Sequence, residues 1–287
     1  MKFLYMTFGL FIFLMGNAFA TDSSLYEANF TYSLYTDKIK YTTSPLNEGN
    51  ATKLSVNGID VFVGITVWSD TGKYNSESDS YESDNLVKNQ GFLDGWINSG
   101  TNAIGYGLIN NDSTEQSDYR TSSDAGDSHY IDNRRSGDKG TQDFDMVLLS
   151  FSEAVTLTSG TFSSAYRYGT TPSSDLSVVG LSGIEKFESG EDFTWNDIAT
   201  DTAIGAATGH YAVGNQKDNY FQSKFTGLTA ARYWLVGAYN TIFDNGAIQD
   251  GDFGFKLSSL GFSVDRTPDT PSTEVSEPGM LALMGLG

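Results

Sequence analysis

The strongest constraint on the fold is an alternating run of apolar residues in the first quarter of the chain. In the segment 59–68 (IDVFVGITVW), apolar side chains recur at every second position. This period places successive side chains on opposite faces of a half-buried β-strand. No stretch of a dozen residues repeats apolar positions with helical spacing, so long helices are not expected.

Further strand-like segments follow along the chain, separated by glycine and Asp/Asn/Ser clusters that favour turns. They are residues 144–151, 154–158, 161–168, 175–181, 230–239 and 253–264, with a tight turn expected at Ser152-Glu153. Residues 69–90 and 111–140 are polar and predict long loops, either solvated or forming part of a binding rim. We therefore predict an all-β fold for residues 21–265, a two-sheet antiparallel sandwich of jelly-roll type with long polar loops.

Charge and composition exclude several classes of protein. The formal net charge is −19, which is incompatible with a basic nucleic-acid-binding face and unfavourable for docking on anionic lipid. The 19 Phe and 16 Tyr supply enough apolar surface for a core. Cysteine is absent and histidine occurs only at His129 and His210, which removes disulfides, thiolate chemistry and multi-histidine metal centres.

Both ends of the chain differ from the middle. Residues 1–20 combine Lys2, an apolar run and Ala18-Phe19-Ala20, which predicts a cleaved signal peptide. The alternatives are a membrane anchor or a buried helix. Residues 266–276 are rich in Pro and Thr and predict an extended linker. The segment 277–287 contains the apolar residues 279–287, which are short for a membrane span, so we expect it to continue beyond Gly287; a final element docked on the domain is the alternative.

The segment from Val275 through Ser276, Glu277 and Pro278 into the Leu/Ala/Gly-rich residues 279–287 resembles the PEP-CTERM sorting signal of Gram-negative bacteria. The resemblance implies recognition by an exosortase-type transpeptidase, transient anchoring in the inner membrane, and export to the cell surface or the extracellular space. Val275, Glu277 and Pro278 match the motif. Ser276 replaces its usual first proline, and the Arg cluster that ends such tails is missing.

A series of motifs in the middle of the chain resembles a family of exosortase-dependent surface proteins. The series comprises residues 105–111 (GYGLINN), 127–133 (DSHYIDN), 143–150 (DFDMVLLS), 151–157 (FSEAVTL), 173–178 (SSDLSV), 233–239 (YWLVGAY) and 252–257 (DFGFKL). The D-S-D of the family is Ser173-Ser174-Asp175 here. The resemblance implies location and fold and carries no catalytic residues. It favours a non-enzymatic exported surface or matrix protein.

Two groups of residues invite a catalytic interpretation. His129 with Asp132 and Asn133 has the makings of a general base, but no G-x-S-x-G motif accompanies it. The alternative is that Asp132 and Asn133 cap a turn while His129 tethers the loop; His210 is interpreted in the same way. Asp143 and Asp145 could pair as in a glycosidase, or could mark a solvated sheet face.

Three acids lie close together between the last two predicted strands. Asp244, Asp250 and Asp252 share nine residues with two amides, and oxygen-rich loops of this kind bind calcium. The spacing is not that of an EF-hand. The sequence therefore leaves open a calcium site or an ordinary acidic turn.

Aromatic side chains are abundant and could stack on sugar rings, or could face the core, as most aromatic side chains of a β-sandwich do. The candidates are Tyr166, Tyr168, Trp195, Tyr220, Phe221, Tyr233, Trp234 and Tyr239. Of these, Trp195 and Trp234 are the stacking residues of the alternative function, a carbohydrate-binding module acting on exopolysaccharide. A glycoside hydrolase is a third possibility.

Overall fold

The structure is a computed structural model that describes residues 28–34, 52–56, 59–70, 74–75, 80–81, 86–89, 91–97, 100, 102–109, 130–133, 143–169, 175–201, 205–244 and 251–264. The predicted signal peptide, the linker and the sorting residues Val275, Glu277 and Pro278 lie outside these ranges. Within them, no helix is long and apolar enough to cross a membrane.

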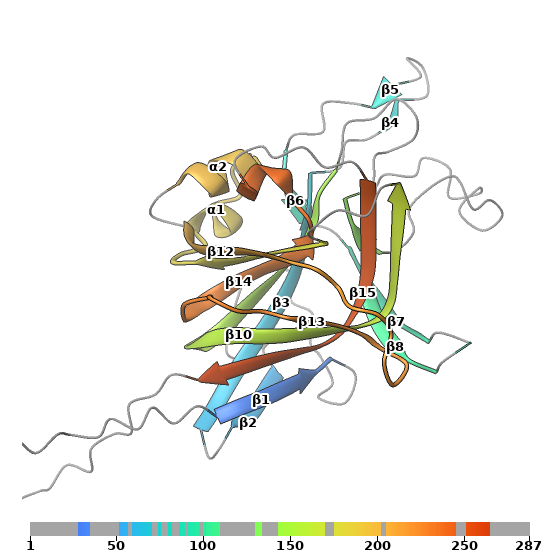
Figure 1. The fold of residues 1–287 in the computed structure, drawn as a ribbon. Helices are drawn as coiled ribbons and strands as arrows, with labels where there is room; N and C mark the ends of the chain where they lie inside the picture. The colour runs from blue at the N-terminus through green and yellow to red at the C-terminus, as the bar shows by residue number, and fades with distance from the viewer. Residues whose placement is uncertain are drawn as a thin grey trace, which may run out of the picture.

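The described residues are mainly β-strands, which confirms the all-β class (Figure 1). The strands are β1 (Ala28–Ser33), β2 (Thr52–Val56), β3 (Ile59–Ser69), β4 (Tyr74–Asn75), β5 (Ser80–Tyr81), β6 (Lys88–Asn89), β7 (Gly91–Ile97), β8 (Ile104–Ile109), β9 (Ile131–Asp132), β10 (Asp145–Gly169), β11 (Leu176–Leu181), β12 (Gly205–Tyr211), β13 (Phe221–Lys224), β14 (Ala231–Ala238) and β15 (Gly251–Val264). The helices are α1 (Glu185–Glu188), α2 (Trp195–Thr200) and the 3-10 turn η2 (Thr241–Asp244). The strands predicted at 59–68, 175–181, 230–239 and 253–264 are confirmed as β3, β11, β14 and β15.

Strand β10 replaces three of the predicted strands. Its 25 residues cover segments 144–151, 154–158 and 161–168 almost without interruption, so the turn expected at Ser152-Glu153 is wrong. The ladder with β14 instead shifts register between Ser150 and Val155. Extra residues on one strand form a bulge, which bends the strand without reversing it.

Every ladder is antiparallel, and hydrogen bonding connects thirteen strands into one sheet with the main order β12-β11-β14-β10-β15-β8-β7. The first part of β10 lies between β14 and β3, and the rest pairs with β15. The end of β10 and the start of β15 stand upright at the right of Figure 1, at a steep angle to the strands on the left. The expected division into two separate sheets is not confirmed, because β10 and β15 run through both parts.

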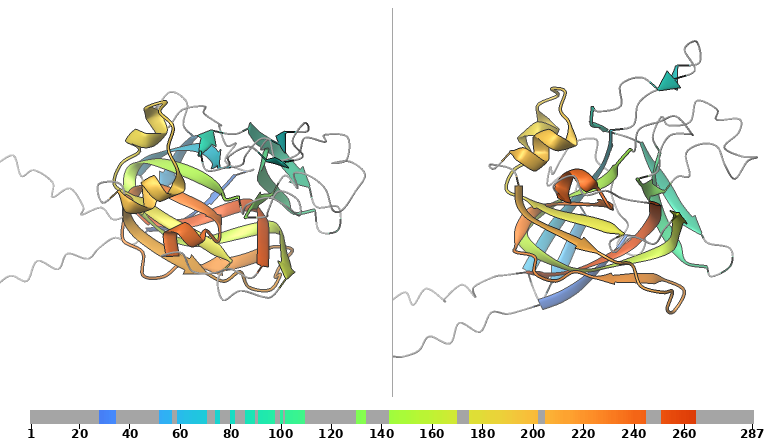
Figure 2. Two further views of the ribbon diagram at one scale, coloured as in Figure 1. Left: turned by 90° about the horizontal axis from the view of Figure 1, so that it is seen from above. Right: turned by 45° about the horizontal axis from the view of Figure 1, so that its top comes forward.

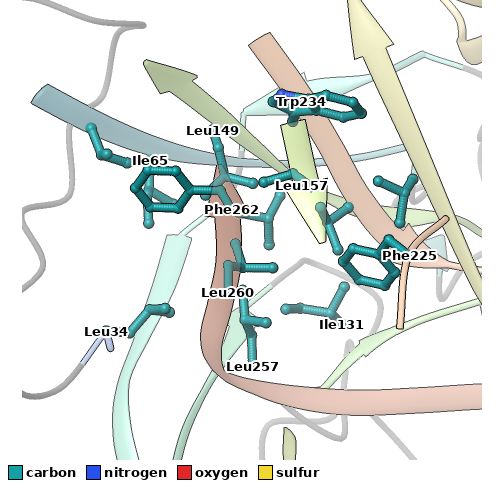
Figure 3. Packing of buried hydrophobic residues seen from close by; sticks show 14 of the residues in the cluster. Leu34, Ile65, Ile131, Leu149, Leu157, Phe225, Trp234, Leu257, Leu260 and Phe262 are labelled. Atoms are coloured by element: carbon teal, nitrogen blue, oxygen red, sulfur yellow. The ribbon is translucent and has the colours of Figure 1, made fainter. Parts of the chain in front are cut away.

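The main core consists of the buried apolar side chains of β2, β3, β8, β9, β10, β11, β14 and β15, with Leu34, Val213 and Phe225. On β15 the inward residues Phe253, Phe255, Leu257, Leu260 and Phe262 are all fully buried. Figure 3 shows Phe262 among Ile65, Leu149 and Leu157 of this core. Burial of each such side chain stabilises the fold by roughly 1.5–3 kcal/mol.

A second, smaller core lies on the opposite face of the sheet. Met146, Leu148 and Leu235 of that face pack against residues of the helical segment 184–198, which covers them from one side (Figure 2). Helix α2 begins at a capping box, in which the Thr194 side chain accepts from the Asp197 backbone and Asp197 accepts from Thr194. The two sheet faces are therefore both covered where β10, β11 and β14 meet.

The predicted loop 69–90 contributes to this second core. Val87 is buried, and its N–H donates to the carbonyl of Phe193 at 2.8 Å. Lys88 forms an ion pair with Asp192 beside it. Part of the loop is therefore fastened to the helical segment through Val87, while Leu86, Lys88 and Asn89 are exposed.

Candidate functional site

The two tryptophans expected to stack on sugars are both in the protein interior. Trp195 and Trp234 are each 0% exposed. The Trp195 indole donates to the carbonyl of Phe144 at 3.1 Å, and that of Trp234 donates to the carbonyls of Val155 and Ala231, each at 3.1 Å. Figure 3 shows Trp234 packed over the core. The stacking prediction is wrong for both, because each ring faces a core and has no surface free for a sugar.

The other aromatic candidates are also partly or wholly covered. Tyr239 is buried, and Tyr166, Tyr220, Phe221 and Tyr233 are half-buried; the Tyr168 side chain lies outside the described part. The neighbours Tyr233 and Trp234 divide as alternation requires, since Trp234 faces the main core and Tyr233 the opposite side.

The strand register brings together a polar cluster that the sequence separates widely. His210 of β12 lies opposite Ser177 of β11, with Nδ1 3.0 Å from the serine Oγ. Its Nε2 lies 3.9 Å from Oδ1 of Asp244, and Tyr239 donates its hydroxyl to Oδ2 of the same carboxylate. The His210 and Tyr239 rings meet edge to face, with centroids 5.1 Å apart. We call these four residues the His210 cluster.

The His210 cluster has the residue types of a hydrolase triad without its accessibility. Ser177 is 0% exposed, and its Oγ accepts the N–H of Asn240 at 2.8 Å. A nucleophile must reach its substrate, and this hydroxyl does not. The cluster instead fastens η2 and the end of β14 to the edge of the sheet.

Burial controls protonation within the His210 cluster. Desolvation lowers the pKa of His210, although the nearby Asp244 carboxylate opposes the shift. Burial, together with the Asp244 carboxylate, raises the pKa of Tyr239 to about 12. At neutral pH the cluster therefore holds a neutral imidazole and a neutral phenol around one carboxylate.

Asp244 is the only proposed calcium ligand whose side chain the structure describes. Its carboxylate already accepts from Tyr239. Asp250 lies outside the described residues, and only the backbone of Asp252 is described, paired with Tyr168. Among the described residues no group of three or more His, Cys, Asp or Glu is placed to hold a metal. Calcium binding by this loop stays a prediction.

Asp143 and Asp145 lie in the interior. Each is 2% exposed, so the solvated sheet face expected at this position is wrong, and a buried pair does not meet a polysaccharide either. Oδ2 of Asp145 accepts the backbone N–H of Asp132 at 3.2 Å. This hydrogen bond fastens Asp132 to the start of β10.

Asp70 belongs to the same buried region and was not singled out in the sequence. Its Oδ1 accepts the N–H of Phe144 at 2.6 Å. Burial raises the pKa of Asp70 well above its usual value, and the Asp143 charge adds to the rise, while the hydrogen bonds from Phe144 and Trp195 oppose it. Asp70 directly follows the last residue of β3, a strand that is buried on both faces near its end. An acidic residue at the end of such an apolar run is the sequence feature that could have identified Asp70.

Asp132 and Asn133, which were expected to cap a turn, instead form long-range hydrogen bonds. Asn133 donates its amide to the carbonyl of Tyr239 and accepts the N–H of Phe253, both at 2.7 Å. Asp132 accepts the hydroxyl of Tyr166 at 2.8 Å. His129 lies outside the described residues.

The acid that remains of the D-S-D motif is also structural. Asp175 is 1% exposed and receives two hydrogen bonds from the Arg167 guanidinium, at 2.8 and 2.6 Å. It also accepts the N–H of Val213 at 2.6 Å, and Arg167 donates to the carbonyl of Val213. The pair holds the end of β10 to the start of β11 and to residue 213.

Comparisons with protein-family models, with curated proteins and with solved structures find no match to this chain. The polar clusters described above form hydrogen bonds within the domain, and each joins strand ends or connecting segments.

Proposed function

We propose that the chain is a non-enzymatic exported protein of the cell surface or extracellular matrix, sorted through its C-terminal segment by an exosortase-type transpeptidase. The observation that carries the proposal is the pairing of β1 with β15, in which Ala28 lies opposite Val264. The expected signal-peptide junction before Thr21 and the expected linker from residue 266 therefore join the domain at neighbouring points (Figure 1).

This arrangement suits a domain whose two ends are both processed at a membrane. Neighbouring strands lie about 4.8 Å apart, so the two attachment points share one end of the sheet. Glu277 follows Val264 by 13 residues. An extended Pro-rich segment of that length spans about 40 Å at about 3.1 Å per residue, which leaves room for a membrane enzyme to reach the motif beside a folded domain.

The polar clusters support the non-enzymatic part of the proposal. The Ser177 hydroxyl and the Asp143 and Asp145 carboxylates, the groups closest to catalytic types, are buried. The alternative of an exopolysaccharide-binding module rested on Trp195 and Trp234, whose burial removes its named residues. Retention of the protein on host polysaccharide would support this alternative and would indicate that other residues bind the sugar.

The sorting proposal is tested in an exosortase-containing Gram-negative host and in the same host without the enzyme. The variant Glu277→Ala/Pro278→Ala removes the motif, and Pro271→Ala/Glu274→Ala is a matched control that takes the same residue types from the linker. We expect the wild type and the control to lose the tail, measured by intact mass, and to reach the surface only when the enzyme is present. The motif variant should keep its tail and stay in the inner membrane. Cytosolic retention of the wild type, or equal processing of all three chains, would refute the proposal.

A further inference from the structure

Strand β15, which leads into the expected C-terminal linker, is hydrogen-bonded to other strands along both of its edges. On one edge it pairs with β10 from Val155↔Val264 to Gly169↔Gly251. On the other edge β1 pairs with its last six residues, and the N–H of Leu34 donates to the carbonyl of Ser258. The strand that would carry the load of the anchor is thus interior to the sheet.

Strands β8 and β9 also pair with β15 in its first half, whereas β10 and β1 both pair with its last residues and differ in how far they extend. The pairing with β10 covers the whole of β15, and the inward side chains of both strands lie in the main core. The pairing with β1 is short, and Phe30 packs against Phe262 across it, with ring centroids 5.4 Å apart. Phe262 also packs on Phe151 of β10, at 5.3 Å.

The direction of a pull decides which bonds carry it. Antiparallel ladder bonds lie perpendicular to the strands. A pull along β15 against the far end of β10 loads many of these bonds at once, as shear. A pull that separates Ala28 from Val264, which lie at the same end of their ladder, opens the bonds one pair after another.

We propose that β15 is the force-bearing strand of the anchored domain and that β1 is a cover that peels away under load applied at the N-terminus. This inference rests on the proposed function, because the load arises from the C-terminal anchor. A domain anchored through its C-terminus would then resist a force applied to the rest of the domain. A force applied at its N-terminus would release only a short N-terminal segment.

Single-molecule force measurements on the full chain test the difference. The chain has no cysteine, so pairs of introduced cysteines are clean attachment points for handles. The peeling geometry uses Ala28→Cys with Asp265→Cys, and the shear geometry uses Thr170→Cys with Asp265→Cys. We expect a several-fold higher unfolding force in the shear geometry. In the peeling geometry, a first step at low force should release β1 and Leu34 (residues 28–34), an extension of at least about 23 Å at 3.3–3.6 Å per residue.

Two variants separate this mechanism from general weakening. Phe30→Ala should lower the force of the first peeling step more than it lowers the shear force. Phe221→Ala removes a half-buried ring from β13, which pairs with β10 instead of β15, and should leave the peeling step unchanged. Equal forces in the two geometries, or a single cooperative step in both, would overturn the inference. Since the handles replace the biological anchor, that outcome is distinct from a failure of sorting, which fractionation measures.

Discussion

The backbone N–H of Phe144 donates to Oδ1 of Asp70 at 2.6 Å in a site where both residues are buried. The bond fastens the end of β3 to the residue before β10. It places a carboxyl group among apolar side chains, next to the carboxyl group of Asp143. The hydrogen bond stabilises the contact between the two segments. Burial of the Asp70 side chain opposes this, because it disfavours the charged form of the carboxyl group.

We expect Asp70→Asn to stabilise the protein at neutral pH by about 1–2 kcal/mol, because the amide oxygen still accepts the Phe144 N–H and the buried charge is gone. The folded-state pKa is raised, so the destabilisation is full above that pKa, declines as the pH falls below it, and is gone below the ordinary aspartate pKa of about 4. The advantage of the variant should therefore shrink on acidification. Urea unfolding at several pH values measures this, with the exposed Asp60→Asn as control. A variant less stable than the wild type at neutral pH would contradict the interpretation.

Stability should fall as the pH decreases below about 6.5, the ordinary pKa of histidine, partly because of His210. Its folded-state pKa is lowered, so the unfolded chain takes up a proton before the folded one does. His210→Gln should reduce the loss of melting temperature between pH 7.5 and pH 5.5. His129→Gln is the matched control, since it removes the other histidine. Parallel profiles for the wild type and His210→Gln would exclude this role.

Replacing the buried Trp234 should reveal its structural task. Trp234→Ala leaves a large cavity and should cost about 3–5 kcal/mol. Trp234→Phe keeps much of the apolar volume but removes the donor to the carbonyls of Val155 and Ala231, and should cost about 1–3 kcal/mol. Tyr233→Phe, at the half-buried neighbour, is the control and should have little effect in chemical denaturation. A Trp234→Ala protein of unchanged stability would show that the ring is not part of the core.

Breaking the Arg167–Asp175 pair should destabilise the protein strongly, because Asp175 is left charged and buried. We expect Arg167→Met to cost about 3 kcal/mol. The double variant Arg167→Met/Asp175→Asn should be more stable than Arg167→Met alone, since the uncompensated charge is removed. Additive losses in the double-mutant cycle would indicate that the pair contributes no coupling.

Calcium binding by the acidic loop predicts a shift in melting temperature. A site that binds only the folded form stabilises it by about 2.7 kcal/mol at a hundredfold excess over Kd, which corresponds to roughly 5–10 °C for a domain of this size. Melting in calcium, magnesium and EDTA at equal ionic strength measures it, with Asp250→Ala as the test variant and the exposed Glu188→Ala as control. Asp244 is unsuitable for this test, because it also holds Tyr239. Identical midpoints in calcium and EDTA would reduce the loop to an acidic turn.

Local patterns in the sequence were enough to predict the class of the fold and the positions of four of its strands, with β10 predicted as three separate segments. The alternation in 59–68 and the apolar runs 175–181, 230–239 and 253–264 appear as β3, β11, β14 and β15, whose residues are largely buried. The sequence predicted a turn cap for Asn133, and the bonds to Tyr239 and Phe253 depend on contacts between distant segments. The sorting residues Val275, Glu277 and Pro278 are an inference from the sequence alone.

Only the tertiary structure decided which side chains are covered and which distant residues meet. Trp195 and Trp234 are buried because the helical segment 184–198 covers one sheet face and β15 helps to fill the other, and a periodic pattern does not show what lies over a strand. The bulge that makes β10 one strand depends on its partners β14 and β15. The contact of His210 with Ser177 and Asp244 depends on strand register, which is fixed by packing across the sheet between residues far apart in the chain.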